Sequence, residues 1–110
     1  MRIGDIVLTT IPQDNQQKKR PVLILKILPR YNDLLVCAIS SQVHQFVPNF
    51  DLELKISDAA FADTGLIKNS IVRLGSLAVL STIDVIGTIG FLEKKLHRKL
   101  LQNLSDFLTA

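Results

Sequence analysis

The chain has 110 residues, a length that one hydrophobic core of about 100–150 residues serves, so the sequence predicts a single domain over residues 1–110. Hydrophobic residues make up 47% of the chain, which excludes disorder, and no apolar window reaches the roughly 18–20 residues of a membrane-spanning helix. The net charge of +3 is compatible with a nucleic-acid partner, whereas five Phe, one Tyr and no Trp weaken any recognition built on base stacking. The first ten residues lack the long apolar core of a signal peptide, so we expect a cytoplasmic protein without a membrane partner.

Six apolar segments rich in β-branched residues predict a mainly β (α+β) chain. We place the strands at residues 4–10, 22–28, 34–40, 50–56, 70–80 and 85–91. Pro12 closes the first strand and Pro21 opens the second, because proline withholds a backbone donor. The polar residues 13–20 between them lack periodicity and predict a loop. PRYND, residues 29–33, has the composition of a turn between the second and third strands.

The middle of the chain gives more local predictions. Residues 50–56 alternate in polarity and predict a half-buried strand, with Ile56 on the buried face and Asp51 on the solvated face. The following segment predicts one helical turn with Ser57 as N-cap and Gly65 as terminator. Gly75 marks a bulge or a close backbone approach in the fifth strand.

The last segment, EKKLHRKLLQNLSDFL, has the periodicity of an amphipathic helix. Its apolar stripe consists of Leu96, Leu100, Leu101, Leu104, Phe107 and Leu108. Its basic residues, mostly on the other side, are Lys94, Lys95, Arg98 and Lys99. A basic helix face can bind phosphates, but we interpret this one as a solvated face. The sequence thus predicts a small, strongly curved antiparallel sheet with one C-terminal helix packed across it.

No common catalytic motif is present. The chain lacks a glycine-rich phosphate loop and a GxSxG nucleophile motif. Its two histidines, His44 and His97, have no metal-binding spacing, so we predict no metal site. Cys37, the only cysteine, stands inside an apolar strand and is interpreted as a small buried hydrophobe.

A polar set does gather where the second and third predicted strands would meet. A hairpin centred near residue 30 puts Arg20 beside Ser40 at one rim of the sheet. Its flanking polar residues are Lys18, Lys19, Ser41 and Gln42. A guanidinium fork and a hydroxyl suit a phosphodiester, and RNA brings its own nucleophile in the 2′-OH, so no cofactor is required. The alternative is that Arg20 and Ser40 are ordinary surface residues without a role in a site, because Arg and Ser are common at exposed strand ends.

Taken in order, five segments resemble the MazF/PemK (Kid-like) toxin family of type II toxin–antitoxin systems. They are GDIVLTT, KRPVLIL, NDLLVCAISSQ, NSIVRLGSLAVLST and IGFLEKKLHRKLLQNL, and they cover nearly the whole chain. The resemblance implies a small SH3-like curved β-barrel with a C-terminal helix, working as a homodimer. It implies metal-independent, sequence-selective cleavage of single-stranded RNA to a 2′,3′-cyclic phosphate, and neutralisation by a cognate antitoxin protein.

The resemblance also assigns roles by position. Arg20 matches the family's catalytic arginine, and Ser40 matches its catalytic threonine. Ser41 and Gln42 follow as expected RNA contacts, and Arg73 falls where PemK/Kid-type members carry a second functional arginine that we expect to bind RNA. Lys18 and Lys19 are expected to bind RNA because of their charge beside Arg20, and gatekeeping at the strand start is their alternative role. Asp5 fills an early acidic position, either as an acid/base group or as a structural cap. Gly75 stands where PemK/Kid-type members carry an Asp, so that acid/base group is missing.

Two alternatives stay open. One is a MazF-like binding domain with weak or no turnover, which the missing Asp at Gly75 favours. The other is a CcdB-like gyrase poison, which relies on a W-G-I tail; this chain contains no Trp and ends in FLTA.

Overall fold

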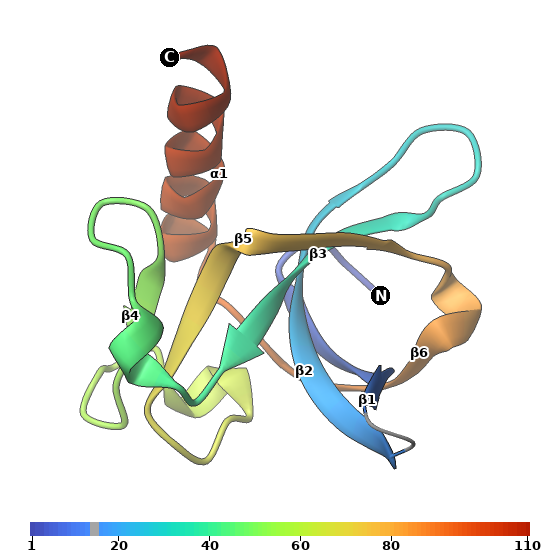
Figure 1. The fold of residues 1–110 in the computed structure, drawn as a ribbon, viewed down its shortest axis with the longest axis horizontal. Helices are drawn as coiled ribbons and strands as arrows, with labels where there is room; N and C mark the ends of the chain where they lie inside the picture. The colour runs from blue at the N-terminus through green and yellow to red at the C-terminus, as the bar shows by residue number, and fades with distance from the viewer. Residues whose placement is uncertain (14–15) are drawn as a thin grey trace.

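A computed structural model describes residues 1–13 and 16–110 of the chain. The elements of this part are β1 (Asp5–Gln13), β2 (Gln16–Ile27), β3 (Leu34–Ser40), η1 (Val43–Gln45), β4 (Leu52–Leu54), η2 (Ala62–Thr64), β5 (Ser70–Leu80), η3 (Thr82–Asp84), β6 (Val85–Phe91) and α1 (Lys94–Thr109). The strands form one sheet in the order β4-β5-β3-β2-β1-β6, with every neighbouring pair antiparallel. The predicted mainly β fold with a C-terminal helix is confirmed (Figure 1).

The sheet is strongly curved but open, because β4 and β6 are its edges and no ladder joins them in the described residues. Bulges bend and twist strands, and the largest one lies between β3 and β5. There the partner of β3 changes from Leu77, opposite Cys37, to Arg73, opposite Ala38. Gly75 lies inside the extra segment, which confirms the predicted bulge, and Figure 1 shows β5 bending partway along its length.

The hairpin of β1 and β2 is longer than predicted. β1 continues past Pro12 and β2 begins at Gln16, so the strand end at Pro12 and the loop over residues 13–20 were wrong predictions. Residues 14–15 of that loop lie outside the described part. β6 pairs with β1, and β3 with β2, only nearer the body of the sheet, so the extension has free edges. Proline is tolerated at such edges, which is why Pro12 does not stop the strand.

Side chains of the sheet alternate between two apolar clusters. The cluster facing α1 contains Ile6, Leu23, Leu25, Cys37, Ile39, Leu54, Phe61, Val72, Leu74, Leu92, Leu100 and Leu104. The cluster on the other face contains Val7, Val22, Ile24, Leu34 and Val36. β3 contributes to both, as its unbroken apolar sequence predicted, and each fully buried Leu, Ile or Val contributes about 1.5–3 kcal/mol.

Only part of the apolar stripe of α1 is buried against the sheet. Leu100 and Leu104 pack on the sheet, while Phe107 and Leu108 are 65% and 67% exposed. The last turns of α1 extend beyond the sheet (Figure 1), and Phe107 instead contacts the ring of Phe50 at 5.3 Å between centroids. No helix of the described residues has both the length and the apolarity to cross a membrane.

The segment around β4 departs from its predicted alternation. The strand spans only three residues, and Ile56, 61% exposed, and Asp51, 8% exposed, both depart from their predicted faces. Leu54 is buried and Lys55 is exposed, as predicted. Asp51 is buried because it binds two backbone N–H groups, which the alternation of polar and apolar residues does not reveal. The Asp51 carboxylate accepts hydrogen bonds from the Val47 N–H at 3.0 Å and the Leu74 N–H at 3.1 Å.

The turn η2 packs closely against β6. Gly65 ends this turn with a φ of 74°, as predicted, whereas the N-cap is Phe61 and not Ser57. A Cβ atom at Gly65 would collide with the backbone of Ile89, and one at Gly90 would collide with the backbone of η2. The two glycines therefore permit an approach that other residues would prevent.

Candidate functional site

Strands β2, β3 and β5 enclose a cavity of about 370 Å³ at one rim of the sheet. Its lining residues are Arg20, Pro21, Ala38, Ile39, Ser40, Ser41, Gln42 and Arg73. The ladder explains the gathering, because Val22 and Arg73 pair with Ala38 from its two sides. Continuing the β2–β3 register by two residues brings Arg20 across from Ser40. Three strands thus deliver two arginines and a serine to one place.

Ser40 is held by a local hydrogen bond. Its Oγ accepts from the Gln42 N–H at 3.0 Å, which fixes the oxygen where β3 leaves the sheet. The same hydroxyl keeps its own proton for donation. The Ser40 hydroxyl can therefore donate a hydrogen bond to an anion in the cavity.

The charge of the cavity lining is positive. Arg20 and Arg73 carry permanent guanidinium charges, and no lining residue is a carboxylate. Arg73 is half-buried and Arg20 is exposed, so both remain accessible to a ligand. A pair of planar donor forks around a polar cavity suits a phosphodiester group.

Comparison with known proteins fits this geometry. A family model described as "PemK-like, MazF-like toxin of type II toxin-antitoxin system" matches residues 2–108. The chain belongs to this toxin family. Among solved structures, Mycobacterium tuberculosis toxin MazF-mt6 has a TM-score of 0.71 over 96% of each chain, at 20% sequence identity, which supports the fold. No curated protein gives a significant match.

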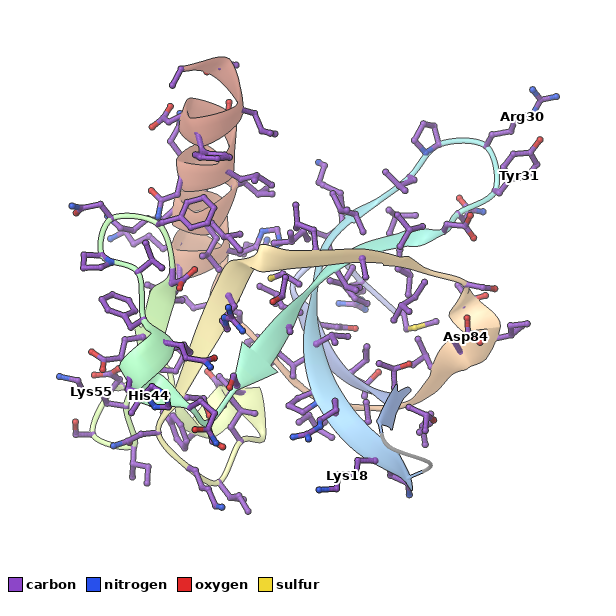
Figure 2. The ribbon with its side chains drawn as sticks, viewed as in Figure 1. Lys18, Arg30, Tyr31, His44, Lys55 and Asp84 are labelled. Atoms are coloured by element: carbon purple, nitrogen blue, oxygen red, sulfur yellow. The ribbon has the colours of Figure 1, made fainter. Side chains whose placement is uncertain are left out.

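The toxin's cavity includes some of the predicted site residues and not others. Arg20, Ser40, Ser41, Gln42 and Arg73 line it; their roles in RNA binding and cleavage stay predictions. Lys18 and Lys19 are exposed and outside the lining, paired with β1 along the hairpin extension, where Figure 2 shows Lys18 near the tip.

Asp5 also lies outside this cavity. It starts β1, about 13 Å along the strand from Thr9, the residue opposite Arg20. Its Oδ2 accepts a hydrogen bond from the Arg2 N–H at 2.9 Å. This contact favours the structural cap over an acid/base role.

Other reactive groups of the toxin lie elsewhere. Burial, with a smaller effect of the Asp51 charge, raises the pKa of the Cys37 thiol to about 12, so the thiol is protonated and not a nucleophile. His44 is exposed on η1 and does not line the cavity (Figure 2). Among residues 1–13 and 16–110, no three His, Cys, Asp or Glu side chains gather as a metal-binding group.

Sequence reasoning missed a second cavity beside the first. It measures about 320 Å³, shares Ala38 with the polar cavity and is mainly apolar. Its other lining residues are Thr9, Thr10, Val22, Val36, Ser76, Leu77, Ala78 and Leu80. They come from four strands and form no contiguous motif, so only the curvature of the sheet creates this surface.

Proposed function

We propose that this toxin is a metal-independent, sequence-selective endoribonuclease that cleaves single-stranded RNA. The observation that carries the proposal is the polar cavity, which Arg20 and Arg73 line together with Ser40. Family membership supports the same activity. Single-stranded RNA is the expected substrate because its unpaired bases and backbone are accessible to a shallow site.

The reaction needs no nucleophile from the protein. The 2′-oxygen attacks the adjacent phosphorus, an O–P bond forms, and the bond from phosphorus to the 5′-oxygen breaks. The 2′-OH loses its proton and the departing 5′-oxygen gains one, which leaves a 2′,3′-cyclic phosphate and a 5′-hydroxyl. The protein holds the phosphodiester so that attacking and leaving oxygens are in line.

Arg20 is assigned the main role in stabilising charge on the non-bridging oxygens. One preorganised donor of this kind contributes about 2.7–4 kcal/mol, or about 10²–10³ in rate. Ser40 donates to the same phosphate, and Arg73 binds it from β5. Ser41 and Gln42 contact the RNA beyond the cleaved bond, and Lys18 and Lys19 attract its backbone along the hairpin.

Two protein partners belong to this proposal. A toxin of a type II system has a cognate antitoxin, and we expect that protein to block the positive cavity. We also expect a homodimer, as the family suggests.

The decisive experiment is cleavage of a long single-stranded RNA in excess EDTA by wild type and by Arg20→Ala. Arg30→Ala is the matched control, because it removes the same charge at the tip of the β2–β3 turn, far from the cavity (Figure 2). We expect recurring cuts from wild type and the control, ending in cyclic phosphates, and a loss of about 10²–10³ in rate for Arg20→Ala. Equal cutting by all three proteins would refute the assignment of Arg20.

A second candidate function is RNA binding without turnover. The observation that favours it is the lining, which offers neither a carboxylate nor an imidazole as proton acceptor. RNA that is bound but left uncut by wild type would establish this alternative.

A further inference from the structure

A third cavity lies away from the polar cavity, between the start of the chain, the end of β2 and the first turns of α1. It measures about 310 Å³. Its basic lining residues are Lys26, Lys94, His97 and Arg98, which together define the basic groove. Lys26 is six residues from Arg20 on β2, about 20 Å along the strand. The basic groove is thus separate from the proposed cleavage site.

The lining of the basic groove is positively charged. None of its lining residues is a carboxylate. Within residues 1–13 and 16–110, Lys26, Lys94 and Arg98 form no ion pair within 4.0 Å. Asp5 lines a neighbouring cavity together with Lys94, but its carboxylate lies more than 4.0 Å from the Lys94 ammonium, since the two form no ion pair. Three exposed cations therefore line the basic groove without a direct ion-pair partner among the described residues.

One groove cation, Lys94, stands at an unfavourable place for the helix itself. Lys94 and Lys95 are the first two residues of α1, and its first turn has no acidic residue. The N-cap, Glu93, makes no side-chain capping hydrogen bond. Cations at this positive end of the helix dipole destabilise it by about 0.3–1 kcal/mol each. A local arrangement that opposes stability is expected where a site has a function.

His97 fixes the geometry of the basic groove. Its Nε2 lies 3.2 Å from the Ile24 carbonyl oxygen, which also accepts from the Gly4 N–H at 2.8 Å. This contact joins α1 to β2 and so holds Lys94 and Arg98 near Lys26. Burial lowers the pKa of His97, with a smaller effect of Lys26 in the same direction, so the imidazole is neutral near pH 7.

We propose that the basic groove binds backbone phosphates of single-stranded RNA outside the cleaved bond, an inference that rests on the proposed ribonuclease function. Three exposed cations along one groove suit successive, singly charged phosphodiester groups of an RNA backbone. An acidic peptide presents the same charge, and the comparison with poly-glutamate below distinguishes it from RNA.

The test measures binding of a single-stranded 2′-O-methyl oligonucleotide by fluorescence anisotropy over a range of salt concentrations. The methyl group removes the nucleophilic hydroxyl, so binding is separated from cleavage. The groove variant carries Lys26→Gln, Lys94→Gln and Arg98→Gln, all exposed positions. The control variant carries Arg30→Gln, Lys55→Gln and Lys68→Gln, which remove the same charge from other exposed positions.

The slope of log K against log salt is negative, and we expect its magnitude to be smaller by about 2 in the groove variant, since each of three lost phosphate contacts on a single strand contributes about 0.7. Over the decade from about 1 M to about 0.1 M salt, this difference corresponds to an affinity about 100-fold weaker. The control variant should bind like wild type. Equal losses in the two variants, or tighter wild-type binding to poly-glutamate than to the oligonucleotide, would overturn the proposal.

Cleavage assays separate this inference from the proposed function. A short RNA that reaches only the polar cavity should be cut equally by wild type and by the groove variant, whereas a long RNA should be cut with a higher KM by the variant. If wild type cuts RNA and the groove variant binds the oligonucleotide as wild type does, RNA binding by the basic groove is refuted and the ribonuclease function stands. If wild type cuts nothing and the groove variant still loses affinity, the ribonuclease is refuted and the basic groove stands.

Discussion

The buried carboxylate of Asp51 joins the segment after η1 to β5, directly beside the candidate site. It is 8% exposed and accepts hydrogen bonds from the N–H groups of Val47 and Leu74. Leu74 follows Arg73 and is fully buried, so its N–H has no route to water if the carboxylate is removed. Asp51→Ala should therefore destabilise the fold and loosen the strand that carries Arg73.

The size of the effect follows from the two bonds. A hydrogen bond to a charged group contributes about 1.5–3 kcal/mol, and a buried donor left without a partner loses the most. We assign about 2–3 kcal/mol to the Leu74 bond and about 1 kcal/mol to the Val47 bond, because water can replace the latter at a residue 49% exposed. The total of about 3–4 kcal/mol corresponds to a Tm lower by about 12–16 °C for a domain of this size.

Thermal unfolding followed by circular dichroism measures this difference. Asp51→Asn is the matched control, since an amide keeps one acceptor oxygen and should lose about half as much stability. A Tm for Asp51→Ala within about 3 °C of wild type would refute the role given to these two hydrogen bonds.

Two further predictions concern the core and the η2 contact. The raised pKa of Cys37 keeps its thiol protonated, so a thiol reagent at pH 8 should react only as the protein unfolds. The folded pKa of about 12 exceeds the unfolded value of about 8.5, so the free energy of unfolding should fall by about 1.4 kcal/mol per pH unit above about pH 9. A Cys37→Ala variant whose free energy of unfolding falls with the same slope would contradict this. Gly90→Ala should destabilise by about 2–3 kcal/mol in urea unfolding, while Gly87→Ala, where a Cβ meets nothing within 4 Å, should not; equal effects would exclude the packing explanation.

The part of the site that local sequence determines could be predicted. The turn at residues 29–33 has Arg30 and Asn32 at positive φ, and the Leu28 N–H donates to the Asp33 carbonyl at 2.8 Å. A turn of fixed length sets the hairpin register, and the register sets which residues meet at the open end. The turn alone would bring Arg20 opposite Ser41, and the register shift between Ile24 and Lys26 moves its partner by one residue to Ser40.

Features that depend on distant partners could not be predicted. Alternation assigned Asp51 to solvent because it counts only neighbours along the strand, whereas the buried Leu74 N–H that it binds belongs to β5. The predicted burial of Ile56 was also wrong because of a distant partner, since β4 pairs with β5 only as far as Leu54. Alternating polarity predicts burial only where the strand is paired, and tertiary structure decides how many residues are paired.

The basic groove shows how one irregularity hides a site from pattern analysis. Strict alternation along β2 would put Lys26 on the face of Val22 and Ile24, away from α1. The β2–β3 register shifts between Ile24 and Lys26, however, and a bulge turns successive residues toward one side. Leu25 packs in the cluster that contains α1, and Lys26 lines the basic groove with His97 of α1. A single bulge therefore moves a lysine from the far face of the sheet to the helix, where it meets the two cations that the helical periodicity had assigned to solvent.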